Sequence, residues 1–130
     1  MTETITATFE ITGWDETPYD EPAEGPKLTR ATVHKRFSGP LEATSVAQLL
    51  TAQGDEGRGY LASERVEGSL DGRAGTFVLQ HGGSGDAAEQ RAFGHVVPGS
   101  GTGELRGLRG DAEFAHDDAG ARVTLTYTLA

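Results

Sequence analysis

The sequence lacks cysteine altogether, which excludes disulfides, thiolate nucleophiles and zinc–thiolate sites. It is also poor in basic residues: 11 Lys and Arg stand against 20 Asp and Glu, giving a formal net charge of −9. Nucleic acids and anionic membrane surfaces attract proteins through a basic face, so we expect neither as a partner. No apolar run is long enough for a membrane-spanning helix. The N-terminal residues show no basic region followed by an apolar core, so a cytoplasmic location is expected.

Motifs of metal, hydrolase and glycosidase sites are missing as well. The four histidines lack the close spacing of metal ligands, and we expect neither a metal nor a cofactor. No serine has the G-x-S-x-G surroundings of a hydrolase nucleophile. Glu64 and Glu67 fall on opposite faces of a strand, unlike the paired carboxylates of a glycosidase.

Glycine, by contrast, is abundant: there are 19 in 130 residues, and they are densest at residues 98–110. A phosphate-binding P-loop ends with Lys and Ser or Thr, whereas here Glu104 follows the glycines and would repel phosphate. The dinucleotide fingerprint fails too, because Glu104 and Arg106 stand where its third glycine belongs. We therefore predict a compact connection that folds back onto a sheet, with Leu105 and Leu108 on one side of a single helical turn.

Polar and apolar residues alternate along most of the chain, which is typical of half-buried β-strands. The pattern is cleanest over residues 4–12 and 122–129. Further strands are predicted at residues 27–38, 41–52, 57–68, 73–82, 87–97 and 110–116. Of these, 41–52 would also tolerate a helix. Turns rich in glycine and aspartate separate the strands, as in antiparallel hairpins.

Eight consecutive strands, each with one apolar face, remove their exposed edges by closing into a ring. At 130 residues the chain is one domain, residues 1–130, and we predict an all-β, eight-stranded antiparallel β-barrel. A barrel of this size is filled by side chains or holds one small ligand. Residues 14–26 contain three prolines and five acidic residues and are predicted to form a long irregular loop over one barrel end. Trp14, at the root of this loop, either caps that end or packs structurally.

Four ionisable residues fall on the predicted inner faces of strands: Lys35, Glu64, His81 and His95. The apolar residues that share these faces are Ala31, Val33 and Phe37, then Tyr60, Ala62 and Val66, then Phe77 and Leu79, and finally Phe93 and Val97. An apolar pocket with a few convergent polar groups is the usual composition of a small-molecule site.

Two interpretations of these inward residues stay open. In the first, Lys35, Tyr60, Glu64, His81 and His95 bind a ligand, and Glu64 and His81 are the candidate catalytic residues because both are able to move a proton. In the second, Lys35 and Glu64 form a buried ion pair that only satisfies itself, and the histidines lie at strand ends.

The order of several motifs along the chain resembles a known family. The motifs are Gly13-Trp14-Asp15-Glu16, Pro18-Tyr19-Asp20, Lys35-Arg36-Phe37-Ser38-Gly39, Glu64-Arg65-Val66-Glu67-Gly68, Gly75-Thr76-Phe77-Val78-Leu79-Gln80-His81 and the glycine-rich segment itself. Together they resemble a bacterial family of unknown function whose barrel is similar to those of allene oxide cyclases and dirigent proteins. The resemblance implies a calycin-like or allene oxide cyclase-like barrel and no established activity.

Three functions follow as hypotheses. The first is a barrel that binds a small apolar or amphipathic molecule. The second is a cofactor-free isomerase or cyclase in which Glu64, His81 or Lys35 polarises the substrate, as the resemblance to allene oxide cyclases suggests. The third is a protein-interaction module with a solid barrel and a working outer face. A homo-oligomer is compatible with all three.

Overall fold

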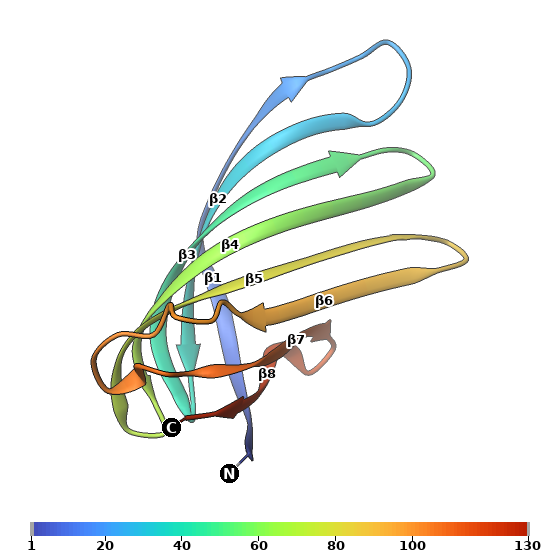
Figure 1. Ribbon diagram of the computed structural model, residues 1–130. Helices are drawn as coiled ribbons and strands as arrows, with labels where there is room; N and C mark the ends of the chain where they lie inside the picture. The colour runs from blue at the N-terminus through green and yellow to red at the C-terminus, as the bar shows by residue number, and fades with distance from the viewer. Residues whose placement is uncertain (1, 130) are drawn as a thin grey trace.

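The computed structural model describes residues 2–129, which form a closed barrel in which each strand pairs with its neighbours in sequence and β8 pairs with β1 (Figure 1). In chain order the elements are β1 (Thr2–Asp20), β2 (Lys27–Ser38), β3 (Leu41–Gln53), β4 (Gly57–Leu70), β5 (Arg73–Asp86), β6 (Gln90–Val96), the short 3-10 helix η1 (Gly103–Leu105), β7 (Arg109–Asp117) and β8 (Gly120–Thr128). All neighbouring strands run antiparallel, so the predicted fold class is confirmed. No helix among residues 2–129 is long and apolar enough to span a bilayer.

The β4–β5 hairpin illustrates how the sequence specifies these turns. Asp71 and Gly72 link the strands with φ angles of 49° and 83°. Two successive positive φ values match the type I′ turn, whose twist suits an antiparallel hairpin and for which Asp-Gly is a preferred pair. The predicted turn is therefore confirmed. β3 is also a strand throughout, and the helical alternative for residues 41–52 is wrong.

β1 is much longer than the alternating pattern suggested, and the predicted loop over residues 14–26 is wrong for its first part. A register shift between Ile11 and Gly13 inserts an extra residue. The alternation of inward and outward side chains reverses at this point, so the sequence pattern does not reveal the rest of the strand. β8 pairs with β1 only as far as Phe9, so the rest of β1 is an edge. Pro18, which has no backbone N–H to donate, is tolerated on such an edge.

β5 also continues further than expected, through the glycine-rich residues that were predicted to be a loop. Gly82 and Gly83 each leave room for a ring on a different face of the sheet. A Cβ on Gly82 would lie 2.7 Å from the Phe93 ring, and one on Gly83 would lie 3.4 Å from the Tyr60 ring. The glycines here serve close packing within a strand, which composition alone does not distinguish from a turn.

The glycine-rich segment between β6 and β7 covers the edge of β5 over the stretch that β6 does not reach. The Thr102 backbone N–H donates to Thr76 O, and the Thr76 N–H donates to the Thr102 hydroxyl. The Val78 N–H donates to Ser100 Oγ. η1 supplies the predicted helical turn, with Leu105 and Leu108 both buried. The segment therefore satisfies the backbone groups at the edge of β5.

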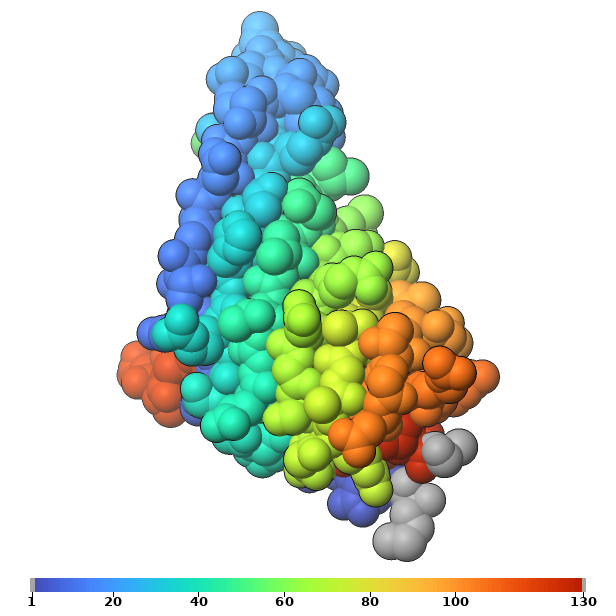
Figure 2. Space-filling view, turned by 90° about the vertical axis from the view of Figure 1, so that its left-hand side faces the viewer, coloured from blue at the N-terminus to red at the C-terminus, as the bar shows by residue number. Residues whose placement is uncertain are grey.

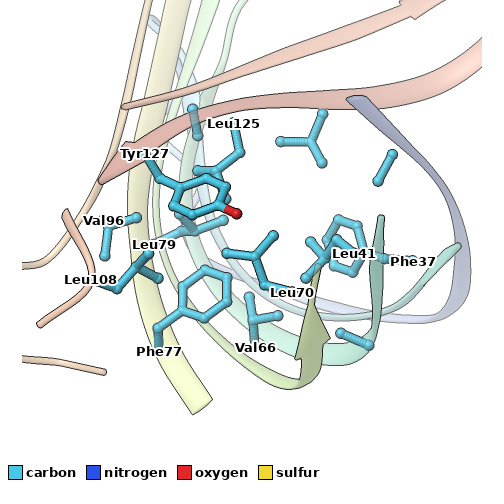
Figure 3. Packing of buried hydrophobic residues seen from close by; sticks show 14 of the residues in the cluster. Phe37, Leu41, Val66, Leu70, Phe77, Leu79, Val96, Leu108, Leu125 and Tyr127 are labelled. Atoms are coloured by element: carbon cyan, nitrogen blue, oxygen red, sulfur yellow. The ribbon is translucent and has the colours of Figure 1, made fainter. Parts of the chain in front are cut away.

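One end of the barrel is filled by side chains (Figure 3). The largest fully buried apolar residues in this core are Phe37, Leu41, Leu70, Phe77, Leu79, Leu105, Leu108 and Leu125. They come from β2, β3, β4, β5, the β6–β7 connection and β8, so the core links nearly every part of the ring. This end of the barrel is therefore solid, filled by side chains.

The other end is open because β7 and β8 are short. The β1–β2, β3–β4 and β5–β6 hairpins project beyond these two strands (Figure 1). β6 and β7 pair at only one position, His95 with Asp111. We call the part of β1–β6 beyond the pairs Phe9–Ala121 and His95–Asp111 the open half. It tapers toward the tip of the β1–β2 hairpin, light blue at the top of Figure 2.

Candidate functional site

Four of the five predicted site residues lie together at the boundary between the solid core and the open half. Along β2, Lys35 is the first inward residue beyond Phe37, and it pairs with Ile11, just past the last β1–β8 pair. Glu64 follows Val66 in the same way on β4. His81 follows Leu79 on β5 and pairs with Gly94. These side chains form the first inward layer that β7 and β8 do not enclose by strand pairing.

Glu64 is the centre of this layer and is completely buried. One of its carboxylate oxygens, Oε1, accepts from Lys35 Nζ at 3.1 Å and from His81 Nε2 at 2.7 Å. The other, Oε2, accepts from Ser45 Oγ at 2.6 Å. A buried carboxylate is tolerated only when it is paired and hydrogen-bonded, and Glu64 has three donors.

Tyr60 completes a hydrogen-bonded chain. Its hydroxyl lies 2.9 Å from His81 Nδ1, while Nε2 of the same imidazole points at Glu64. The order is therefore phenol, imidazole, carboxylate. An ionised carboxylate only accepts, so Nε2 carries a hydrogen, and in the neutral ring Nδ1 is then an acceptor for the Tyr60 O–H. We call Tyr60, His81, Glu64 and Lys35 the relay.

Two phenylalanines hold the charged part of the relay in place. Lys35 Nζ lies 4.8 Å from the ring centre of Phe9 and 4.7 Å from that of Phe114, within range of a cation–π attraction to each. The His81 ring packs against that of Phe114, tilted by 34° with 4.4 Å between ring centres. The aromatic rings come from β1 and β7, so closure of the barrel is what brings them to Lys35 and His81.

The proton affinities of the relay follow from this packing. Burial alone would raise the pKa of Glu64, but the hydrogen bond from His81, the charge of Lys35 and the hydrogen bond from Ser45 outweigh it and lower that pKa. Burial raises the pKa of Tyr60, and the nearby Glu64 charge raises it further. The relay therefore holds an ionised Glu64 carboxylate and a protonated Tyr60 phenol at neutral pH, with the His81 ring between them.

Beyond the relay, the inner face of the open half exposes large apolar side chains. Ile11 pairs with Lys35 and is 45% exposed, and Trp14 pairs with Val33 and is 53% exposed. Tyr60 is half-buried on the same face. Trp14 donates its indole N–H to Glu16 at 2.9 Å. Trp14 therefore belongs to a strand that lines the open half and does not lie at the root of a loop.

Glu16 organises the polar rim of this inner face. Its Oε2 accepts from Thr29 Oγ1 and from Gln53 Nε2, each at 2.7 Å. Hydrogen bonds from Thr29, Trp14 and Gln53, in this order of size, lower the pKa of Glu16. These contacts tie β1 to β2 and β3 at the far end of the sheet, where β7 and β8 are absent.

His95, the fifth predicted site residue, does not join the others, and its predicted inward position is wrong. On β6 the buried residue is Val96, at 2% exposure, so His95 and Phe93 lie on the outer face, where their rings stack 6.3 Å apart. Both alternating sets of β6 contain apolar residues, so alternation could not decide between them. The pairing decides: Gly94 lies opposite inward His81 and leaves it space.

The outer face of the open half carries an exposed apolar row of its own. Leu50 pairs with Leu61, Leu61 with Gly82, and Gly82 with Phe93, so the row crosses four strands. Leu50, Leu61 and Phe93 are about half exposed. All three line two adjoining shallow hollows of about 560 and 450 Å3. We call Leu50, Leu61 and Phe93 the outer row.

Ser45, Phe9 and Phe114 also belong to the site, although their roles were not predicted from the sequence. Ser45 carried a signal, since it is the single polar residue between Leu41 and Ala47 on the inner face of β3. The two phenylalanines looked like ordinary core residues, and only the closed ring places them against Lys35. Within residues 2–129, no three His, Asp or Glu side chains gather in a way that could hold a metal ion.

Comparison with known proteins finds a matching family and a similar solved structure. A model of a family described as protein of unknown function (DUF3224) matches residues 5–129, which is nearly the whole chain. The chain belongs to the DUF3224 family. A crystal structure of a DUF3224 protein of unknown function from Shewanella oneidensis MR-1 is 32% identical to it, with a TM-score of 0.84, and the match covers 100% of this chain and 99% of that one. No curated protein matches the chain. Membership in DUF3224 supports the fold and assigns no activity.

Proposed function

We propose that this DUF3224 protein binds a small amphipathic molecule on the inner face of the open half. The observation that carries the proposal is the position of the relay: a buried polar chain that ends in half-buried Tyr60, on the same inner face as the exposed side chains of Ile11 and Trp14. Apolar surface next to a few oriented polar groups is the composition of small-molecule sites. The ligand's apolar body would cover Ile11 and Trp14, and its polar end would meet Tyr60.

The proposal is tested with 4-hexylphenol as the probe and with the fluorescence of Trp14, the only tryptophan, as the signal. Ile11→Asp and Leu61→Asp are a matched pair, because the two side chains are 45% and 58% exposed but lie on opposite faces. We expect Ile11→Asp to weaken binding about tenfold or more, since it replaces apolar contact with a charge. Leu61→Asp should leave binding unchanged. Binding that depends on Leu61 and not on Ile11 would refute the inner-face site.

A cofactor-free isomerase or cyclase is the second candidate, and the relay is the observation that favours it. Phenol, imidazole and carboxylate follow one another as hydroxyl, imidazole and carboxylate do in a catalytic triad. The resemblance to allene oxide cyclases noted in the sequence supports the same candidate. Native mass spectrometry of the purified protein identifies any small molecule that co-purifies. If this molecule is incubated with the protein and recovered unchanged, the result would count against an isomerase.

A further inference from the structure

We infer that the ligand's polar end is a hydrogen-bond donor such as an alcohol or a phenol, which the oxygen of Tyr60 accepts. The inference rests on the proposed function and specifies the chemistry of its ligand. It depends on where each hydrogen of the relay is used, which the distances around His81 and Glu64 determine.

The hydrogens are assigned from the centre outward. Glu64 is ionised and accepts from Lys35, Ser45 and His81, so the His81 hydrogen is on Nε2. The neutral imidazole then has a bare Nδ1, which must accept the Tyr60 O–H at 2.9 Å. The single hydrogen of Tyr60 is thus directed into the protein, and its oxygen presents only lone pairs to the open half.

The other polar groups of the relay are already bonded within the protein. Lys35 is 8% exposed, bonds Glu64 and lies between two phenylalanine rings. Every buried side-chain nitrogen and oxygen among the described residues already has a hydrogen-bond partner. We therefore assign the contact with the ligand to Tyr60 and not to Lys35. A net charge of −9 also disfavours an anionic ligand.

The test compares 4-hexylphenol with 4-hexylanisole, its methyl ether, which has the same apolar body and no donor. Dissociation constants are measured through Trp14 fluorescence at pH 8 in the wild type and in Tyr60→Phe, whose fold is checked by circular dichroism. The ether is more apolar than the phenol, so the two compounds differ in affinity even without a hydrogen bond. Tyr60→Phe, which lacks the accepting oxygen, gives this baseline as the ratio of the ether to the phenol dissociation constant. In the wild type we expect the same ratio to be about two- to tenfold larger, which corresponds to one neutral hydrogen bond.

Equal ratios in the wild type and in Tyr60→Phe would overturn the inference while leaving the proposed function intact, because both compounds would still bind. Failure of both compounds to alter Trp14 fluorescence would instead refute the proposed function.

Discussion

Lys35 and Glu64 form an ion pair that spans three strands, because Lys35 lies on β2, Glu64 on β4, and β3 runs between them. Their side chains are 9% and 0% exposed, and the nitrogen and oxygen are 3.1 Å apart. Such a pair offers limited net stability, but removal of one partner leaves the other charge buried and uncompensated.

Glu64→Gln should therefore lower the free energy of unfolding by about 3–5 kcal/mol, the cost of breaking a buried pair. The measurement is urea unfolding followed by circular dichroism. The double variant Lys35→Met with Glu64→Gln is the control, because it removes both charges. We expect it to be more stable than Glu64→Gln alone, and a double variant that is less stable would contradict the interpretation.

Acid should destabilise the protein partly through the same carboxylate. The pKa of Glu64 is lower in the folded protein than in the unfolded chain. The resulting stability is present above the unfolded pKa of about 4.3 and is lost as the pH falls through the folded value. The double variant without Glu64 should show a shallower loss of unfolding free energy below pH 5 than the wild type. An identical acid dependence would mean that other carboxylates account for it.

Alkali should act through Tyr127, whose hydroxyl hydrogen-bonds to Asp71 in the β4–β5 turn. Burial, followed by the hydrogen bond and charge of Asp71, raises the pKa of Tyr127 to about 12. The stability from this shift is present below the unfolded pKa of about 10 and is lost as the pH rises toward 12. The free energy of unfolding, measured with urea between pH 8 and 11.5, should fall less steeply with pH for Tyr127→Phe than for the wild type. Tyr19→Phe, at a 51% exposed position, should match the wild type.

Gly75 should tolerate no side chain, because the glycine-rich connection lies directly on it. A Cβ at Gly75 would lie 2.1 Å from the carbonyl oxygen of Thr102, a backbone atom that cannot turn away. Gly75→Ala should cost about 1–3 kcal/mol or more in unfolding free energy. Gly13→Ala is the control, since its nearest neighbour would be 3.4 Å away, and it should change stability by less than about 1 kcal/mol. Equal effects of both substitutions would contradict the packing argument.

The outer row predicts self-association. Leu50, Leu61 and Phe93 form one continuous exposed apolar patch, and a patch that meets its own copy about a two-fold axis is self-complementary. Light scattering after gel filtration should find a dimer whose dissociation constant rises at least about tenfold in Leu61→Ser with Phe93→Ser. Ile11→Ser, on the inner face, should leave the dimer intact. A wild type that is monomeric at all concentrations would refute this prediction and with it the interaction-module hypothesis in its dimer form.

Much of the inner face could be predicted residue by residue. Lys35, Glu64 and His81 each interrupt a run of alternating apolar residues, and all three are buried as expected. Alternation succeeds there because one face of each strand is much more apolar than the other. It failed for His95, since both faces of β6 carry apolar residues, and only the pairing with β5 decides which face is inside.

The sequence by itself determined the number of strands, the tight turns between them and the face that most strands bury, because these depend on residues close together in the chain. The glycine-rich segment likewise excluded a nucleotide site through the identity of its own residues, above all Glu104. Only the tertiary structure decided that β1 continues past its bulge, that β7 and β8 leave the barrel open at one end, and that Tyr60, His81, Glu64 and Lys35 meet at the boundary. Strand register and ring closure join residues far apart in sequence, so a local pattern specifies a face and leaves the neighbours across it undetermined.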